Sequence, residues 1–201
     1  MFNFSKTYDF IPELSVEQRQ LEVVYCTKLL GITITSDCKW DSLVTDLVRK
    51  ANKKMWFLIR LKTLGASTDT LVTVFKLFIR QGLEIAAPLW TSALNKGQIA
   101  QLESVQSKVT SIILGPFPPP RSQNRRELLN LPPMQDHRLS LTKKFAIKMS
   151  QDSKFSYLFP KRDQSKTRNK QPYVTPICLT KRFQTSSIPS FIDILNKETH
   201  M

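Results

Sequence analysis

The sequence of 201 residues predicts a mainly α-helical fold with an N-terminal β-hairpin, in which a three-helix bundle is followed by short helices and coil. Three observations support this prediction. Strand-forming residues alternate near the N-terminus, apolar residues recur at helical spacing up to residue 115, and ten of the twelve prolines follow that residue. We therefore expect three parts: residues 1–39 form the hairpin, residues 40–115 the bundle, and residues 116–201 a proline-rich, basic tail with short helices.

The hairpin is expected at about residues 8–35. The stretch LEVVYCTKLLGITIT is rich in β-branched and aromatic residues with partial alternation, which is typical of strands. The preceding DFIPELSVEQRQ offers a further strand and a turn region. Gly31 has two interpretations, which both stay open: it allows close approach of another backbone or a ligand, or it marks a bulge or bend in the strand.

The first helix is expected to begin at a cap, Asp41 or Ser42, and to end at Gly65. Its length of about 23 residues corresponds to a rod about 35 Å long. The apolar side, which should be buried, consists of Val44, Leu47, Val48, Ala51, Met55, Leu58 and Ile59. The opposite side carries the candidate nucleic-acid-binding residues Arg49, Lys50, Lys53, Lys54 and Arg60. These cations are expected to lack acidic partners at i,i+4, which favours contact with an external anion over a merely solvated face.

A second helix is expected to start at Ser67, and a third to run from about Asn95 to Gly115. Ala87-Pro88 should kink or end the second helix, because proline disfavours helical geometry in the residue before it. The inward positions of these two helices are Leu71, Val72, Phe75, Phe78, Ile79, Ile99, Leu102, Val105, Val109, Ile112 and Ile113. Four aromatic residues are interpreted as core or rim packing in preference to base-stacking surfaces: Trp40, Trp56, Phe57 and Trp90.

Beyond the prolines, SQNRRELLNLPP and DHRLSLTKKFAIKMS are expected to form two further short helices. Residues 161–172 have the composition of a flexible basic linker, and IPSFIDILNK is expected to dock as a small apolar segment.

The formal net charge of +14 favours an acidic partner over a neutral metabolite. The charge lies after the hairpin: residues 1–40 carry 4 basic and 5 acidic side chains, residues 41–115 carry 10 and 5, and residues 116–201 carry 16 and 6. No apolar run approaches the length of a membrane span, and the N-terminus lacks the pattern of a signal peptide. We therefore expect an intracellular protein, nuclear or cytoplasmic, without a membrane partner.

The sequence predicts no catalytic residue, metal ligand or cofactor. Cys26, Cys38 and Cys178 are too far apart for a CxxC pair and are expected to be reduced thiols. No two acidic residues are closer than four positions, so no paired carboxylates suggest a two-metal site. His137 is interpreted as an ordinary surface side chain, and the five glycines form no phosphate-binding loop.

The order of these elements resembles a known family. The segments KLLGITITSDCKWDSLVTDLVRKANKKMWFLIRLKTLGAS, LFIRQGLEIAAPLWTSAL and LESVQSKVTSIILG are similar to the end of the reverse transcriptase of non-LTR (LINE-like) retrotransposons of the jockey and CR1 type. The segments FAIKMSQDSKFSYLFP and KRFQTSSIPSFIDILN resemble the tail that follows the polymerase in such elements. The resemblance extends from about Phe10 to Lys197.

This resemblance implies that the hairpin is the primer grip at the edge of the palm, with Lys28, Leu29, Leu30 and Gly31 as its candidate residues. It implies that the three-helix bundle is a thumb, which holds the template-primer duplex, and that KANKK belongs to that pattern. The fingers and the catalytic palm would precede residue 1, so Mg²⁺ would belong only to an intact parent polymerase. The implied partners are an RNA/DNA duplex and the missing palm and fingers.

The resulting interpretation is a fragment of an RNA-directed DNA polymerase that binds duplex backbones without sequence specificity. Two alternatives are kept. One is a domain similar to the N-terminal region of AlkB-type nucleic-acid-modifying proteins, but the chain has neither the His-x-Asp pair of an oxygenase nor the Gly-rich loop of a methyltransferase. The other is a noncatalytic basic interaction module, for which the apolar helix faces would have to be free of one another.

Overall fold

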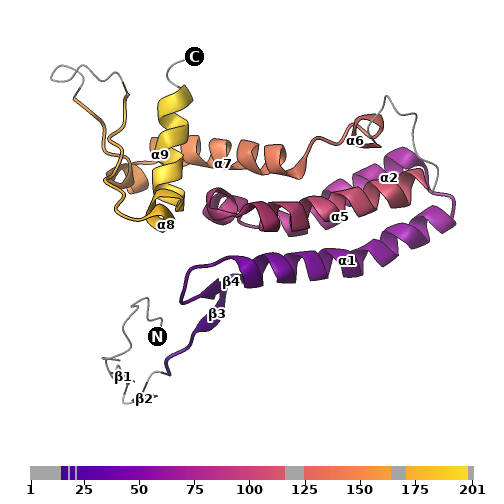
Figure 1. The fold of residues 1–201 in the computed structure, drawn as a ribbon, viewed down its shortest axis with the longest axis horizontal. Helices are drawn as coiled ribbons and strands as arrows, with labels where there is room; N and C mark the ends of the chain where they lie inside the picture. Colours follow the sequence, from indigo (N-terminus) through magenta and orange to yellow (C-terminus); the bar gives the residue numbers. More distant parts are fainter. Residues whose placement is uncertain (1–14, 18, 21, 116–124, 164–170, 199–201) are drawn as a thin grey trace.

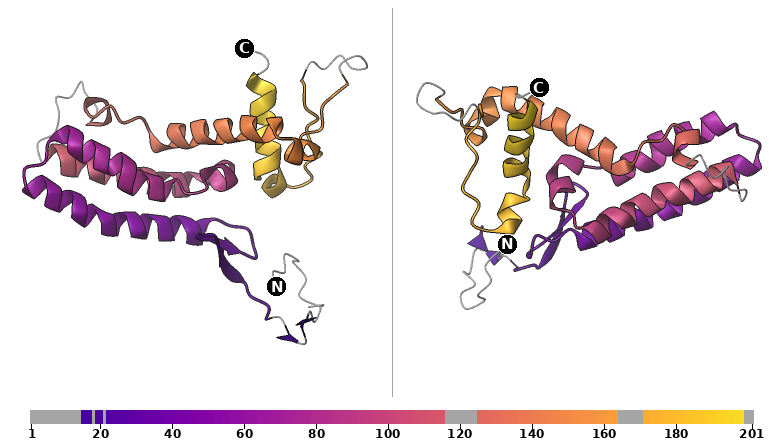
Figure 2. Two further views of the ribbon diagram at one scale, coloured as in Figure 1. Left: turned by 180° about the vertical axis from the view of Figure 1, so that it is seen from behind. Right: turned by 45° about the horizontal axis from the view of Figure 1, so that its top comes forward.

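The computed structural model describes residues 15–17, 19–20, 22–115, 125–163 and 171–198. It is mainly helical with a short hairpin at its N-terminal end, which confirms the predicted fold class (Figure 1). Helix α1 (Asp41–Thr63) lies along one edge, α2 and α5 lie beside it, and α7 lies on the far side of them. Figure 2 shows the same order of layers from two further directions.

The hairpin is shorter than predicted. Strands β3 (Cys26–Leu29) and β4 (Ile32–Thr35) pair antiparallel, with Leu29 opposite Ile32. Leu30 and Gly31 form the turn and both have positive φ, 48° and 87°, as the favoured two-residue hairpin turn requires. Gly31 is thus a turn residue and does not mark a bulge within a strand. Strands β1 (Ser15–Val16) and β2 (Arg19–Gln20) form a separate pair, and residues 8–14 of the predicted hairpin lie outside the described residues.

Helix α1 ends as predicted and begins differently. The amides of Gly65 and Ala66 donate to the carbonyls of Lys62 and Leu61, which is the pattern of a Schellman motif with Gly65 at positive φ. At its start, Trp40 is the N-cap residue and makes no side-chain cap bond. The predicted cap Asp41 lies in the first turn, where its carboxylate accepts a hydrogen bond from Gln98 Nε2 at 2.8 Å.

The second helix consists of α2 (Thr68–Val74), the π-helical η1 (Phe75–Arg80) and α3 (Gln81–Leu83). Ser67 caps it as predicted, since its hydroxyl accepts from the Thr70 amide at 3.2 Å. The helix ends at Leu83, earlier than the predicted Ala87-Pro88, and Ala86 has a left-handed φ of 48°. Pro88 instead lies in the first turn of α4 (Ala87–Trp90). Backbone N–H groups in a first turn have no partner within the helix, so the proline removes no hydrogen bond there.

A short 3₁₀ turn, η2 (Thr91–Ala93), leads into α5 (Lys96–Leu114). Asn95 and Gln98 form a capping box at the start of α5, as each side chain bonds the backbone amide of the other residue. The start predicted near Asn95 is therefore confirmed.

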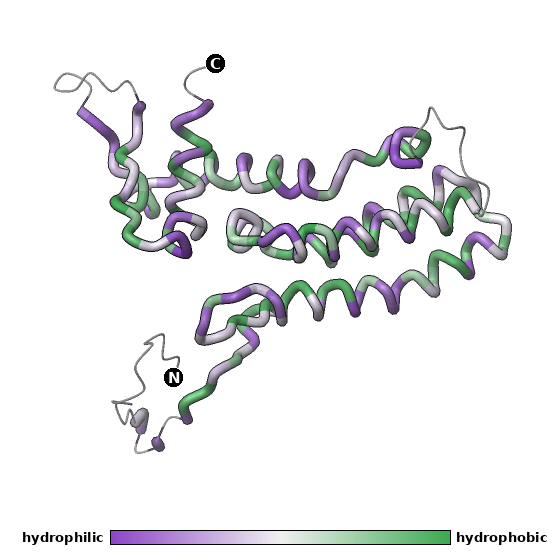
Figure 3. The backbone as a smooth tube through the Cα atoms, in the orientation of Figure 1, coloured by the Kyte–Doolittle hydropathy of each residue, from purple (hydrophilic) through white to green (hydrophobic). Residues whose placement is uncertain are grey.

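The main core joins the hairpin, the three helices of the bundle and the segment that follows residue 124. Ile32, Leu58, Phe75, Val105 and Met134 belong to it, and Figure 3 shows apolar and polar residues alternating along α1 as such one-sided burial requires. Not every inward position was predicted correctly. The side chains of Ile59 and Phe78 are 48% and 47% exposed, because both lie at the edge of the apolar face of their helices.

The aromatic residues divide between core and surface. Trp90 is fully buried and its indole N–H donates to the Ile85 carbonyl at 3.0 Å, and Trp40 packs against the core. Phe57 is partly exposed and meets Phe78 edge to face. The prediction of core or rim packing is wrong for Trp56, whose side chain is 68% exposed.

The C-terminal part contains α6 (Arg125–Leu128), α7 (Met134–Gln151), the 3₁₀ turn η3 (Ser153–Leu158), α8 (Lys181–Gln184) and α9 (Ser187–Glu198). A second cluster, made of Ala146, Phe159, Phe191, Ile192 and Leu195, packs α9 against the end of α7. The apolar docking predicted for IPSFIDILNK is thus confirmed. With 18 residues, α7 is longer than the predicted short helix, and it reaches both cores. The predicted division at residue 115 stays a prediction. Residues 164–170 of the predicted linker lie outside the described residues.

Buried charged side chains connect α7 to the bundle. Glu84 is buried, and its carboxylate lies 2.9 Å from His137 Nδ1 and 3.8 Å from Arg80 Nε. Arg138 is fully buried, with Nη2 4.0 Å from the Glu103 carboxylate. His137 is half-buried against Glu84, so its interpretation as an ordinary surface side chain is wrong. Burial raises the pKa of Glu84 against the opposing effects of His137 and Arg80, and burial lowers the pKa of Arg138.

Removing a core side chain of α1 should destabilise the fold far more than removing an exposed one. Leu58 is fully buried, so Leu58→Ala should lower the free energy of unfolding by about 2–5 kcal/mol through lost burial and a new cavity. Leu64→Ala, next to the end of the same helix at a side chain that is 75% exposed, is the matched control and should change it by less than about 0.5 kcal/mol. Urea denaturation measures both values, and equal losses would contradict the assigned core.

The raised pKa of Glu84 predicts a pH dependence of stability. The folded chain keeps a proton on this carboxyl to a higher pH than the unfolded chain does, so the contribution of Glu84 to stability falls as the pH rises through its folded pKa. The side chain of the Glu84→Gln variant cannot ionise. Its free energy of unfolding should therefore rise relative to that of the wild type as the pH rises from about 4 to about 7. A difference in unfolding free energy that is constant across this range would contradict the assignment.

Candidate nucleic-acid interface

A row of exposed side chains runs along the outward face of α1. Arg49, Lys53, Trp56 and Arg60 stand at i, i+4, i+7 and i+11, a spacing that aligns them on a helix. All four are exposed, whereas the opposite face of the helix is buried in the core. We call these four residues the outer stripe. It places three cations and one indole ring on the same rigid support.

The other two predicted cations lie on the flank of α1 that faces the second helix. Lys54 Nζ donates to the Phe78 carbonyl at 2.8 Å and lies 4.4 Å from the centre of the Phe78 ring. Phe78 belongs to the π-helical η1, whose i→i+5 pattern departs from α-helical bonding at this point. Lys50, one turn before Lys54, is exposed. The structure therefore brings Arg49, Lys53 and Arg60 together and engages Lys54 within the protein.

Asp46 supplies an acid that the sequence interpretation overlooked. Arg49 Nη2 lies 2.8 Å from Asp46 Oδ1, an i,i+3 pair. Asp46 also stands four positions before Lys50, so the expectation that these cations lack acidic partners at i,i+4 is wrong for Lys50. The hydrogen bond from Arg49 is the main reason that the pKa of Asp46 lies below its usual range, and the charges of Lys50 and Lys28 act in the same direction. The pair is exposed at the surface, where such pairs contribute little stability, so an arriving phosphate can compete for Arg49.

A groove runs beside the outer stripe. Helices α1 and α5 are parallel neighbours, linked near their starts by Asp41 and Gln98 and near their ends by a hydrogen bond from Lys62 Nζ to the Ile112 carbonyl (Figures 1 and 2). One hollow of about 640 Å³ between them is lined by Thr45, Val48, Arg49, Asn52, Lys53, Gln101 and Ser104. A second hollow of about 470 Å³ is lined by Met55, Ile59, Ser107, Lys108, Ser111 and Ile112. We call the two hollows together the α1–α5 groove.

The sequence interpretation missed the polar side of this groove on α5. Arg125 donates to the Ser111 hydroxyl at 2.8 Å, and Arg126 donates to the Ser107 hydroxyl at 3.2 Å. Helix α6 thus brings two more guanidinium groups to the outer side of α5. The available signal was the spacing of Ser104, Ser107 and Ser111, which places three hydroxyls along one side of a helix.

The four primer-grip candidates lie at and beside the hairpin tip. Lys28 is close enough to Asp46 to lower the pKa of that carboxyl, so it lies near the start of the outer stripe. Leu29 and Leu30 are 59% and 90% exposed. Gly31 faces a different neighbour, because a β-carbon there would lie 3.8 Å from Ile85 Cδ1. The structure therefore places Lys28 beside the stripe and the tip itself beside the link between α3 and α4.

Among the described residues, no group of three or more His, Cys, Asp or Glu side chains is placed to hold a metal ion. Within the same residues, no helix combines the length and the apolar character needed to cross a bilayer. In comparisons with known proteins, no family model, curated protein or solved structure matches this chain.

The contacts of Lys54 predict a difference in stability between two neighbouring lysines. Lys54→Ala removes a hydrogen bond to a carbonyl and a cation–π contact and should lower the free energy of unfolding by about 1 kcal/mol. Lys50→Ala, one turn away on the same flank, should change it by less than about 0.5 kcal/mol. Chemical denaturation of both variants tests this, and equal effects would show that Lys54 is not engaged as described.

Proposed function

We propose that this chain corresponds to the primer grip, thumb and following tail of a non-LTR retrotransposon reverse transcriptase, and that it holds an RNA/DNA duplex by its backbone without sequence specificity. The observation that carries the proposal is the outer stripe beside the α1–α5 groove. Three cations in line on a 23-residue helix match the requirements of a surface that follows a phosphate backbone.

The dimensions of α1 support this role. Its 23 residues extend about 35 Å, close to one turn of a nucleic-acid duplex. Arg49 and Arg60 are separated by about 16 Å along the axis, so they can reach phosphates that are several nucleotides apart. The exposed Trp56 between them offers an aromatic face for a sugar or an unpaired base. Contacts from these cations to phosphates carry affinity and no base information, which fits binding without sequence preference.

The hairpin tip supports a role at the end of a primer. Leu30 has a left-handed φ of 48°, a conformation that costs a non-glycine residue about 1–2 kcal/mol, while its apolar side chain stays 90% exposed. The hairpin turn requires this φ, and it leaves Leu30 beside the exposed Leu29 at the tip, where both can contact a ligand. The adjacent Lys28 adds a cation on the side of the outer stripe.

Binding of a duplex should be electrostatic and should depend on the outer stripe. With the purified full chain and a fluorescent RNA/DNA hybrid, log affinity should fall with log salt concentration with a slope of about −3 to −6. Arg49→Glu/Lys53→Glu should weaken binding at least tenfold and make the slope less steep, because two phosphate contacts are lost. Fluorescence anisotropy at several salt concentrations measures both effects.

The matched control reverses the same amount of charge elsewhere. Lys144 and Lys148 are exposed on α7, away from the outer stripe, so Lys144→Glu/Lys148→Glu should weaken binding much less. Equal losses in the two double variants would mean that only net charge matters and would contradict the assigned surface. Binding that does not change with salt would contradict the proposal altogether.

A further inference from the structure

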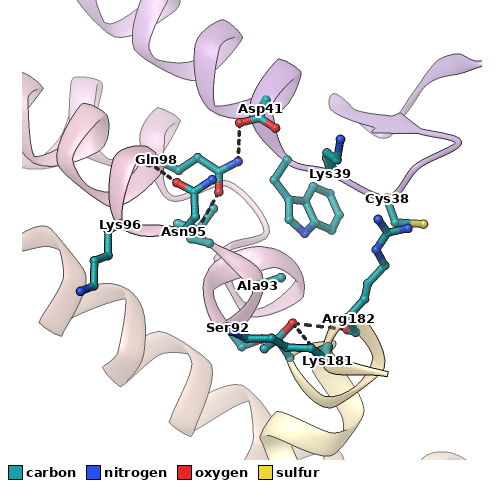
Figure 4. Close-up of a pocket in the computed structure, with 13 residues that line it drawn as sticks. Cys38, Lys39, Asp41, Ser92, Ala93, Asn95, Lys96, Gln98, Lys181 and Arg182 are labelled. Carbon is teal, nitrogen blue, oxygen red and sulfur yellow. Dashed lines mark hydrogen bonds between the residues drawn. The ribbon is translucent and has the colours of Figure 1, made fainter. Parts of the chain in front are cut away.

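A second basic site lies at the N-terminal ends of α1 and α5. A pocket of about 590 Å³ opens between the segment before α1, the turn η2, the start of α5 and helix α8 (Figure 4). Its size lies within the range of small-molecule sites. Residues from distant parts of the sequence meet there, since Cys38 lines it together with Arg182.

The charge of this pocket is strongly positive. Lys39, Lys96, Lys181 and Arg182 line it, and Asp41 is its only acidic lining residue. The Asp41 carboxylate is already engaged by Gln98 Nε2 at 2.8 Å. Lys39 pairs only with the exposed Asp37, and within the described residues Lys96, Lys181 and Arg182 form no ion pair. A pocket with this balance favours an anion.

The pocket is lined by hydroxyl and aromatic groups as well as cations, so it can bind a ligand larger than a simple anion. In Figure 4 the Arg182 side chain extends from α8 toward Cys38 and Lys39, while Lys96 stands beyond Asn95 on the other side. The Ser92 hydroxyl oxygen is buried at the wall and has no hydrogen-bond partner among the described residues. Trp40 adds an aromatic ring to the lining. Cations, a free hydroxyl and an indole are the groups that recognise a phosphate attached to a flat base.

We infer that this pocket binds a nucleoside phosphate, with Lys181 and Arg182 on the phosphate, Ser92 as a hydrogen-bond partner and Trp40 against the base. The chemistry is the same for a free nucleotide and for the phosphorylated end of a nucleic-acid strand. The site is separate from the outer stripe, which lies further along α1, and it goes beyond the proposed binding of duplex backbones.

Isothermal titration calorimetry of the full chain with adenosine monophosphate tests the inference. The nucleotide should bind more tightly than adenosine or inorganic phosphate, because each of these presents only one half of the recognised group. Lys181→Ala/Arg182→Ala should weaken nucleotide binding about tenfold or more through loss of two charge-assisted contacts. Ser92→Ala should weaken it by a smaller factor.

The control Lys144→Ala/Lys148→Ala removes the same charge from exposed positions on α7 and should bind the nucleotide like the wild type. Arg49→Glu/Lys53→Glu should also keep nucleotide binding, so failure of the pocket and failure of the duplex surface are distinguished. All six substituted cations are exposed, and thermal unfolding tests whether each variant is folded. Unchanged nucleotide affinity in Lys181→Ala/Arg182→Ala, or adenosine binding as tightly as the nucleotide, would overturn the inference.

A further comparison identifies the source of the phosphate. A 5′-phosphorylated single strand that binds about tenfold tighter than its 5′-hydroxyl counterpart, with the preference lost in Lys181→Ala/Arg182→Ala, supports a strand end as the ligand. Pocket-dependent binding of the free nucleotide without such a preference supports a free nucleotide. If neither probe binds in a way that depends on Lys181 and Arg182, the inference is wrong.

Discussion

The burial of one face of α1 is the constraint on which the other features depend. Leu47, Ala51 and Leu58 are held against the second helix and α5, so the rotation of α1 about its axis is fixed. Once this rotation is fixed, residues at i, i+4, i+7 and i+11 from Arg49 have to face outward, and Lys54 has to face η1. The same packing brings α5 alongside and creates the groove. The burial of the apolar face involves no ligand, but it decides which cations lie together on the exposed face of α1.

The connection between the bundle and α7 follows a different rule. Here the contact includes Glu84, Glu103, His137 and Arg138, and the burial of such charges is costly unless they are paired. Apolar contacts of Met134 and Leu131 accompany them and supply the favourable area. Charged groups in this position stabilise only one arrangement of the helices, since a shifted α7 would leave Glu84 without His137. The pairing of these charges thus favours one position of α7 against the bundle.

The sequence predicted where helices begin and end better than it predicted which residues contact one another. The limits at Gly65, Ser67 and Asn95 could be read from local capping residues, because the bonds that define them join residues only a few positions apart. His137 and Lys54 could not be placed in this way, since the partner of each lies more than twenty positions away. The exposure of Trp56 was within reach, because it stands at i+7 from Arg49 on the side opposite the predicted apolar residues. The acid beside these cations was within reach, because Asp46 stands three positions before Arg49 and four before Lys50. The π-helical turn has no local signature in the residues Phe75–Arg80 that would separate it from an ordinary helix.

The parallel arrangement of α1 and α5 has an electrical consequence for the whole molecule. Each helix carries a macrodipole equivalent to about half a positive charge at its N-terminal end, and in a parallel pair these add. The second helix, which packs beside this pair and runs in the opposite direction, offsets only one of the two dipoles. One end of the bundle is therefore more positive than side-chain charges alone would make it, and it coincides with the pocket lined by Lys96 and Arg182. An anionic ligand is therefore attracted more strongly to this end of the bundle than to the opposite end, over the short range in which a helix dipole acts.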